Sequence, residues 1–155
     1  MTREEKEAYM REALTLAKAC PASGDVPVGC VVVSDGRIVG RGRNMREANA
    51  SATAHAEILA IEDACRTLKS RTLRGASVFV TLEPCPMCAG AIMLARADNI
   101  YIGALDFVSG ACGSRLNLFD WGIAPAPKIE YGILKGECAR LLSDFFEEMR
   151  KNRGS

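Results

Sequence analysis

Residues 77–104 have the sequence SVFVTLEPCPMCAGAIMLARADNIYIGA. The first part, residues 77–82, is short, apolar and rich in β-branched side chains, which is typical of a buried strand. Residues 84–95 open with proline and continue as an apolar stretch, so a helix is expected there. Residues 99–104 form a second apolar run and predict another strand. A helix enclosed between two strands in so short a span indicates an α/β fold.

The segments on either side extend this alternation of helices and strands. Apolar residues at helical spacing predict helices, and apolar runs bounded by turn residues predict strands. The expected helices are residues 3–20, 54–69 and 137–151, and the expected strands are residues 26–33, 38–42 and 128–134. Residues 106–127 contain Gly and Pro and are expected to be irregular. The order predicts a three-layer α/β/α sandwich with a mixed five-stranded sheet, in a single domain of residues 1–155.

The composition is that of an ordinary globular domain. Apolar residues make up 48% of the 155 residues and charged residues 25%. The net charge is +1, and basic residues are scattered apart from a short tail of Arg150, Lys151 and Arg153. Charge therefore predicts no dedicated nucleic-acid binder, and an RNA partner would have to bind a patch that only folding assembles.

Cysteine usage and the N-terminus bear on the cellular location. The chain has seven cysteines, and its first ten residues are charged, without the apolar core of a signal peptide. No apolar run approaches the roughly 18 residues of a transmembrane helix, so no membrane association is expected. A cytoplasmic, reducing location follows, where cysteines bind metals or remain buried thiols more often than they form disulfides.

One histidine and two cysteines form a candidate metal site. His55 opens one expected helix, and Cys85 and Cys88 open the next. Cysteines three apart in a first helical turn point the same way, and a helix N-terminus favours the ligating thiolate. Three protein ligands leave the fourth tetrahedral position for water, the pattern of a catalytic zinc site. The sequence therefore predicts one Zn²⁺ per chain.

Glu57, two residues after His55, is the candidate catalytic acid and base. Zinc lowers the pKa of water to about 7 at such sites. A carboxylate close by can accept the proton of that water and pass it to a departing amine. Together these residues predict a hydrolytic deaminase.

Other kinds of site share parts of this pattern. A lone C-x-x-C also occurs in redox pairs and in structural zinc sites. A structural zinc site needs a second pair of ligands, and the remaining cysteines are dispersed without that spacing: Cys20, Cys30, Cys65, Cys112 and Cys138. A redox pair would not explain the His-x-Glu motif. A zinc-binding or redox module without turnover is therefore the weaker alternative.

The combination of His55-Ala56-Glu57 with Pro84-Cys85-Pro86-Met87-Cys88 resembles the signature of the cytidine deaminase-like superfamily. Further stretches resemble the bacterial tRNA adenosine deaminases (TadA). These stretches are residues 26–29, 53–58, 80–91, 132–134, 137–138 and 141–146. The resemblance covers nearly the whole chain and implies the cytidine deaminase-like fold.

The resemblance implies a homodimer that converts the wobble adenosine of a tRNA anticodon stem-loop to inosine, with the base extruded into the zinc pocket. Asn44 would contact the target nucleoside, and Val28 would line its pocket. Ala56 and Glu57 would face the base, and Asp106 would lie near the nucleotide backbone. Plainer roles are also open, since Asn44 and Asp106 are common turn residues and Val28 suits a core.

Several positions depart from that branch of the family. Leu105 and Val108 stand where basic residues are common, and residues 51–52 and 120–125 also differ. These changes fall where phosphate and anticodon contacts are expected, and phosphate contacts supply much of the affinity for nucleic acids. A deaminase of a free nucleobase or nucleoside, such as guanine, cytosine or adenosine, is therefore the main alternative function.

Three aromatic residues have open roles. Trp121 could stack on a base, although a lone tryptophan in an irregular loop is more often packed. Phe145 lies on the apolar stripe of the last expected helix and is expected in the core. Phe146 lies off that stripe and is the better candidate for a contact.

Overall fold

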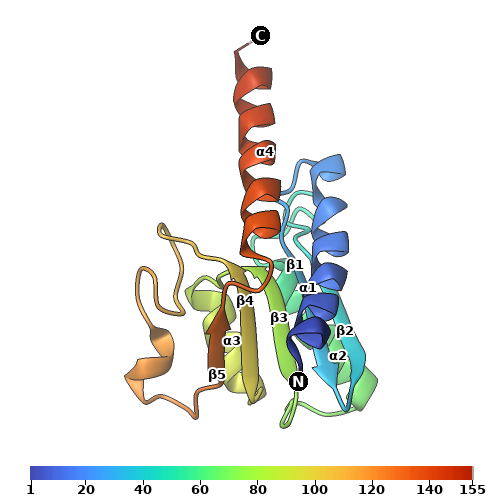
Figure 1. Ribbon diagram of the computed structural model, residues 1–155, viewed down its shortest axis with the longest axis vertical. Coiled ribbons are helices and arrows are strands. Elements are labelled where there is room, and N and C mark those ends of the chain that lie inside the picture. The colour runs from blue at the N-terminus through green and yellow to red at the C-terminus, as the bar shows by residue number, and fades with distance from the viewer. Residues whose placement is uncertain (155) are drawn as a thin grey trace.

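The structure, a computed structural model, describes residues 1–154. Its elements are α1 (Arg3–Lys18), η1 (Cys20–Ser23), β1 (Gly29–Ser34), β2 (Arg37–Arg43), α2 (Ala56–Leu68), β3 (Ser77–Leu82), α3 (Pro86–Ala95), β4 (Asn99–Ala104), η2 (Leu118–Trp121), β5 (Lys128–Tyr131) and α4 (Lys135–Arg153). Figure 1 shows helices and strands alternating along the chain, so the predicted α/β class is confirmed.

The strands form one five-stranded sheet in the order β2-β1-β3-β4-β5. β1 pairs antiparallel with both β2 and β3, whereas β3, β4 and β5 are parallel to one another. The C-terminal ends of β3 and β4 therefore lie at the same edge of the sheet. The turn that carries Cys85 follows β3 at this edge, and the loop that carries Asp106 follows β4. The predicted mixed five-stranded sheet is confirmed.

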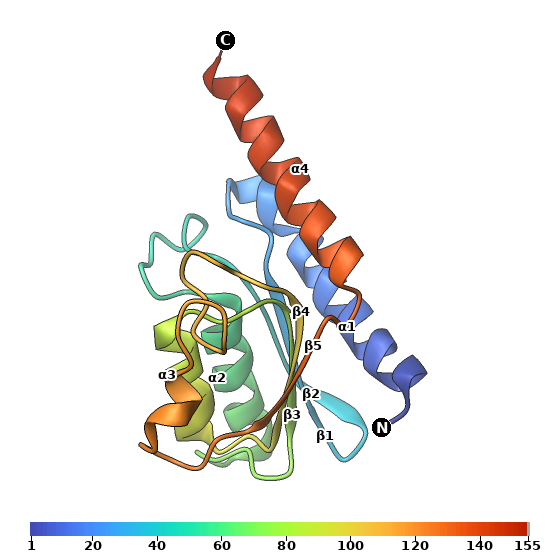
Figure 2. The ribbon, with the colours of Figure 1, turned by 60° about the vertical axis from the view of Figure 1, so that its left-hand side comes forward.

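Helices cover both faces of this sheet (Figure 2). α2 and α3 lie on one face, and α1 and α4 lie on the other. Successive side chains of a strand point to opposite faces, so Val78 and Val80 pack in the cluster beneath α2 and α3, while Phe79 packs with α1 and α4. The predicted three-layer α/β/α sandwich is confirmed.

Two glycines of β2 allow α2 to approach the sheet closely. A Cβ atom at Gly40 or Gly42 would overlap the backbone of α2, and at Gly42 the obstructing atoms include the carbonyl oxygen of Ala56. The first turn of α2 therefore packs directly against the backbone of β2. Because His55 and Glu57 flank Ala56, the glycine contact also fixes the backbone from which they project.

The first helix differs from prediction at its C-terminal end, and the first strand, Gly29–Ser34, differs at both ends. The helix predicted at residues 3–20 ends at Lys18, and Cys20–Ser23 form a separate 3-10 turn. Pro21 in that turn has no N–H with which to continue an α-helix. The strand predicted at residues 26–33 begins at Gly29, since Pro27 likewise cannot donate to a sheet ladder.

The C-terminal boundaries also differ. The strand predicted at residues 128–134 ends at Tyr131. Gly132 and Leu134 have φ angles of 87° and 53°, which are incompatible with an extended strand. The last helix extends beyond the predicted residues 137–151 at both ends, to Lys135 and Arg153.

Helix α4 projects beyond the sheet (Figure 1). Among its described residues only Cys138 is fully buried, while Leu141 and Leu142 pack partly against the α1 side of the core. Phe145 is only half-buried, so its predicted place in the core is wrong. The apolar periodicity correctly predicted which side of α4 is apolar. Because α4 extends beyond the sheet, that side is not covered along its whole length. Phe146 is exposed, as its position off the stripe indicated.

The long connection predicted as irregular, residues 106–127, holds itself in place by local hydrogen bonds. The N–H of Gly110 donates to the carbonyl of Asp106, and the N–H of Leu118 donates to that of Ala111. Ala111 also donates to the carbonyl of Pro84, next to the cysteine motif. The connection is therefore irregular in shape but anchored beside β3.

The cysteines remain free thiols throughout the described chain. Cys20, Cys30, Cys112 and Cys138 are buried thiols. Within residues 1–154, no helix is both long and apolar enough to cross a membrane.

Candidate metal centre and active site

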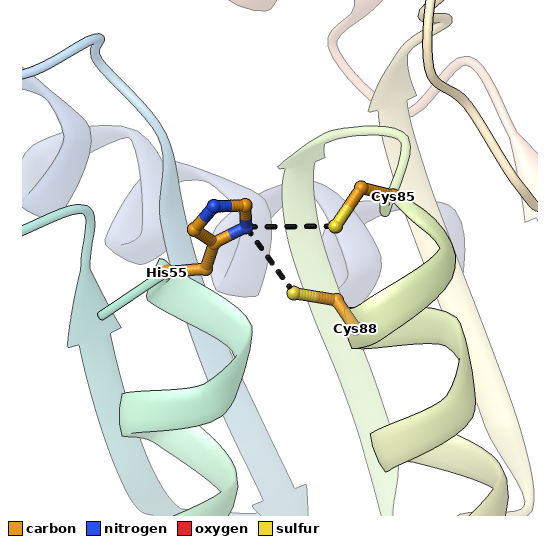
Figure 3. Close-up of side chains that lie close together, drawn as sticks. All are labelled: His55, Cys85 and Cys88. Atoms are coloured by element: carbon orange, nitrogen blue, oxygen red, sulfur yellow. Dashed lines mark hydrogen bonds between the residues drawn. The ribbon is translucent and has the colours of Figure 1, made fainter. Parts of the chain in front are cut away.

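His55, Cys85 and Cys88 meet between two helix N-termini (Figure 3). His55 is the N-cap residue of α2, Cys85 is the N-cap residue of α3, and Cys88 lies in the first turn of α3. Both N-cap residues have extended backbone angles, and side chains in a first turn lean toward the N-terminus of the helix. Each helix therefore directs its ligands into the space between the two.

The spacing of these side chains fits a tetrahedral zinc ion. His55 Nδ1 lies 3.6 Å from Cys85 Sγ and 3.5 Å from Cys88 Sγ. With zinc at about 2.0 Å from nitrogen and about 2.3 Å from sulfur, a tetrahedral angle places the nitrogen and sulfur atoms roughly 3.5 Å apart. In the part of the chain that the structure describes, no other group of three potential ligands is gathered in this way.

The two thiols differ in their readiness to ionise. A hydrogen bond from Cys88, together with one from His55, lowers the pKa of the Cys85 thiol to about 4. The same Cys85–Cys88 hydrogen bond raises the pKa of Cys88, and burial adds to the effect. One thiolate is thus favoured even before a metal binds, and thiolate is the form that ligates zinc.

Glu57 lies in the first turn of α2 with a side chain that is almost fully buried, at 4% exposure. Burial raises the pKa of its carboxyl group to about 7, and the nearby His55 only partly opposes this effect. A carboxyl group with a pKa near neutrality can both accept and donate a proton at physiological pH. The environment of Glu57 therefore suits an acid–base role.

A cavity of about 230 Å³ opens beside these residues. Seven residues predicted from the sequence line it: Val28, Asn44, His55, Ala56, Glu57, Cys85 and Asp106. Cys88 is fully buried and is not among the lining residues. The sequence analysis did not single out the other lining residues: Val26, Arg46, Leu82, Glu83 and Ser109. Each lies within three positions of a predicted residue, which was the available signal.

Asn44 lines the cavity and also holds a turn. Its side-chain amide donates to the carbonyl of Val26 at 3.1 Å, and its Oδ1 accepts from the N–H of Arg46 at 3.2 Å. These bonds shape the turn after β2. An asparagine side chain has a second N–H and a second lone pair, so Asn44 keeps hydrogen-bonding capacity toward the cavity that it lines.

Asp106 also lines the cavity, but its carboxyl group mainly holds its own turn. It accepts from the N–H groups of Val108 at 2.9 Å and Ser109 at 3.1 Å, and from Ser109 Oγ at 2.9 Å. The turn role that was open for Asp106 is therefore present in the structure.

Val28 and Ala56 form apolar parts of the cavity. Both line it, and both belong to the buried cluster between the sheet and α2. The core role of Val28 and its pocket role are thus compatible, because the cavity borders directly on the core.

Asp25 holds the loop between β2 and α2, residues 44–55, which we call the first loop. Its carboxyl group accepts from the N–H groups of Glu47 at 2.6 Å and Ala48 at 3.2 Å, and from Ser23 Oγ at 2.6 Å. Burial would raise the pKa of Asp25, but these hydrogen bonds lower it below the ordinary 3.8. Asp25 thereby fixes the loop that carries Asn44 and Arg46 to the cavity.

Several other residues with open roles lie away from the cavity or face solvent. Cys30 and Cys112 are buried in the core and are not part of the described cavity lining. Trp121 is 65% exposed, so of its two open roles the structure does not show packing. Phe107 and Val108 are also exposed, immediately after the cavity residue Asp106.

Comparison with known proteins gives a consistent result. The model of the cytidine and deoxycytidylate deaminase zinc-binding region matches residues 3–104. A tRNA-specific adenosine deaminase of Bacillus subtilis is 43% identical over 148 residues, which cover 95% of this chain and 92% of that protein.

Solved structures add two relatives. One comes from studies of A-to-I editing by tRNA:A34 deaminases at the wobble position; it has a TM-score of 0.84 and 40% identity, covering 87% of this chain and 99% of that one. The guanine deaminase of Bacillus subtilis has a TM-score of 0.61 and 38% identity, covering 64% of each chain. The family match spans both helix N-termini that carry the potential metal ligands.

Proposed function

Since this chain belongs to the family of the cytidine and deoxycytidylate deaminase zinc-binding region, we propose that it converts the wobble adenosine of a tRNA anticodon to inosine. The family makes it a zinc-dependent hydrolytic deaminase. The observation that carries the choice of substrate is the 43% identity to a tRNA-specific adenosine deaminase over 95% of this chain. The products of the reaction are inosine and ammonia, with water as the second substrate.

His55, Cys85 and Cys88 hold the zinc ion, and their spacing of 3.5 and 3.6 Å supports this role. When bound, zinc supplies the Lewis acidity that makes water ionise near neutral pH. The buried carboxyl group of Glu57 takes the proton of the attacking water. It then gives a proton to the amino nitrogen, which leaves as ammonia. The raised pKa of Glu57, about 7, supports both transfers.

The cavity receives the target base alone. Its volume of about 230 Å³ is below the roughly 300–1,000 Å³ of pockets for drug-sized ligands. A base must leave its stack to enter such a pocket. Val28 and Ala56 supply apolar contact, Asn44 offers its remaining hydrogen-bonding groups, and Asp106 shapes the rim beside the nucleotide backbone.

A deaminase of a free nucleobase or nucleoside is the second candidate. Val108, which is 86% exposed, stands where a basic residue is common in the tRNA-specific branch. This loss of a phosphate contact, together with the 38% identity to a guanine deaminase structure, favours the second candidate. A non-catalytic zinc module is disfavoured, because simple metal binding does not require the buried carboxyl group of Glu57.

We also propose that the protein is a homodimer in the cytoplasm, where its tRNA substrate is found. The outer side of α3 supports the dimer, because Leu94 is 75% exposed on a helix that is apolar all round. Trp121 and Ile123 add exposed apolar surface on the connection that contacts α3 through η2. A second copy of this surface would cover these side chains.

One experiment separates the two candidate substrates. The zinc-loaded protein is incubated with an anticodon stem-loop containing wobble adenosine and, in parallel, with a panel of free bases and nucleosides, and ammonia is measured. We expect ammonia and inosine from the stem-loop. Ammonia from the panel alone would overturn the tRNA assignment. The Glu57→Ala variant serves as the control for contaminating deaminases.

A further inference from the structure

Glu83 is a buried carboxyl residue that the proposed reaction does not use directly. It is the first residue after β3, two positions before Cys85, and it is only 2% exposed. Its backbone N–H donates to the carbonyl of Ala104 at 2.9 Å, which continues the parallel pairing of β3 with β4. Its side chain therefore starts from a fixed backbone at the edge of the sheet that carries the cavity.

All hydrogen bonds of the Glu83 side chain go to residues 105–117, which we call the second loop. Oε1 accepts from the N–H of Asp106 at 3.1 Å, and Oε2 accepts from the N–H groups of Cys112 and Ser114, each at 3.0 Å. Ser114 Oγ also donates to Oε1. One side chain thus accepts four hydrogen bonds from three residues of one loop.

The second loop is built around this carboxyl group. Gly110 lies against it so closely that a Cβ would overlap both the carboxyl group of Glu83 and the carbonyl of Asp106. Ala111 donates to the carbonyl of Pro84 at 2.8 Å, the residue between Glu83 and Cys85. The segment 83–85 therefore carries a metal ligand at one end and holds the second loop at the other.

The second loop contributes Asp106 and Ser109 to the cavity lining. Their distance from the metal ligands depends on where the loop is anchored. We propose that Glu83 is a positioning residue that sets this distance, so that a base in the cavity meets Glu57 and the metal in reactive geometry. The proposal rests on the proposed deaminase function. Glu83 is among the residues that line the cavity, but both of its carboxyl oxygens accept hydrogen bonds from the second loop, so the proposal assigns it no contact with the substrate.

The Glu83→Gln substitution tests this role with little change of shape. In the variant, the single amide oxygen of glutamine will occupy the Oε2 position and accept from the N–H groups of Cys112 and Ser114, because an NH₂ group cannot accept from them. The NH₂ group then faces Asp106, where Ser114 Oγ can accept from it but the N–H of Asp106 loses its acceptor. The variant thus releases the cavity end of the second loop while keeping its far end attached.

We expect Glu83→Gln to bind zinc stoichiometrically and to lose about 10- to 100-fold in kcat, because small displacements of a reacting group have effects of this size. The KM for the stem-loop should change less, since phosphate contacts dominate affinity. Hydrogen exchange should quicken at the amide of Asp106 but not at Cys112 or Ser114. A kcat within two-fold of wild type, with zinc bound, would overturn the proposal.

Val78→Ala is the matched control for lost stability alone. Val78 is fully buried on β3, the strand that leads directly into Glu83, but it does not line the cavity. At a temperature where both variants are folded, its kcat should equal that of wild type. An equal loss of kcat in Val78→Ala would mean that Glu83 acts through stability only.

If Glu83→Gln does not fold, Ser114→Ala decides the matter, because it removes one donor and keeps the carboxyl group. We expect about a two- to ten-fold fall in kcat with zinc retained, and an unchanged kcat would contradict the positioning role. The substrate preference of the wild-type protein tests the proposed function separately from the role of Glu83. A wild type that deaminates only a free base refutes the tRNA substrate, and the variant comparison is then made with that base.

Discussion

The metal-binding side of the cavity and its substrate-facing side are held in different ways. His55, Cys85 and Cys88 lie at the first turns of α2 and α3, so two packed helices set their positions. The first and second loops are irregular, and each is held from outside by a buried carboxyl group, Asp25 for the first and Glu83 for the second.

This difference indicates which parts of the site keep their geometry when a single contact is lost. In a helix the same hydrogen bond repeats along the chain, so no single contact decides where the metal ligands lie. A loop held by a few side-chain contacts shifts when one of them is lost. We therefore expect substitutions on the metal side to abolish the reaction, and substitutions on the loop side to change its rate, its affinity or its choice of substrate.

The largest expected effect is that of Cys85→Ser. Serine keeps the backbone of the α3 N-terminus but replaces a thiolate with a hydroxyl group, which is a poor zinc ligand at neutral pH. We expect zinc to fall from one ion to well below one per chain and ammonia release to disappear. Elemental analysis after gel filtration measures the metal. Cys65→Ser, on α2 but outside the ligand group, should keep both zinc and activity.

Glu57→Gln should come next in size. The substitution keeps the shape of the side chain and removes its acid–base capacity, which contributes about 10²- to 10⁴-fold to kcat in enzymes. Zinc should remain bound, because Glu57 is not one of the gathered ligands. Zinc content and ammonia release are measured on the same sample. Turnover close to that of wild type would remove Glu57 from the proposed mechanism.

The metal side was also the part that the sequence predicted best. Helix periodicity fixes the geometry within His-x-Glu and within C-x-x-C, because each motif lies within one helical turn. His55 and Cys85 are 30 residues apart, and their meeting was expected only because the two motifs together form a known family signature. The strand–helix–strand succession of residues 77–104 and the sheet class followed from equally local patterns. Every residue named for the metal site therefore lies where the sequence indicated.

The loop side could not be predicted in the same way. The sequence analysis singled out neither Asp25 nor Glu83, because their partners lie far away in sequence. Glu47 is 22 residues from Asp25, and Ser114 is 31 residues from Glu83. Such pairings depend on the tertiary fold. The same limit applies to Phe145, since periodicity gives the face of a helix but not what covers it.

Asp25→Asn tests the anchoring of the first loop. The amide can retain one N–H donor of the loop but not all three hydrogen bonds. We expect a loss of about 1–3 kcal/mol in the free energy of unfolding and a fall of up to about ten-fold in kcat/KM, with zinc unchanged. Urea denaturation and steady-state kinetics measure the two effects. A fall in zinc content instead would show that the loop and metal sides are not separable.

Asp25 also gives a dependence on pH. Its pKa in the folded protein lies below the ordinary 3.8, so its stabilisation is present above that value and is lost as the pH falls through the folded pKa. The difference in unfolding free energy between wild type and Asp25→Asn should therefore be constant from about pH 7 to 5 and shrink below about pH 4. A difference that grew on acidification would contradict the role given to these hydrogen bonds.

The smallest expected effect is that of Val108→Lys, which bears on the choice of substrate. Val108 projects from the second loop beside the cavity and is 86% exposed, so a lysine there costs no burial. If the rim meets the RNA backbone, one added phosphate contact should steepen the dependence of log Kd on log salt by about one. Affinity for the stem-loop should rise a few-fold at low salt and less at high salt.

Val108→Gln is the control, because it adds length and polarity without charge. A salt dependence that steepens with lysine but not with glutamine means that the rim lies against phosphate, as a tRNA substrate requires. Identical behaviour of the two variants means that the rim does not approach the RNA backbone and supports the free base or nucleoside. Because Val108 lies outside the cavity, kcat on any free nucleoside should be the same in both variants and in wild type. The loop side would then determine which substrate binds, while the metal side alone determines that the bound base is deaminated.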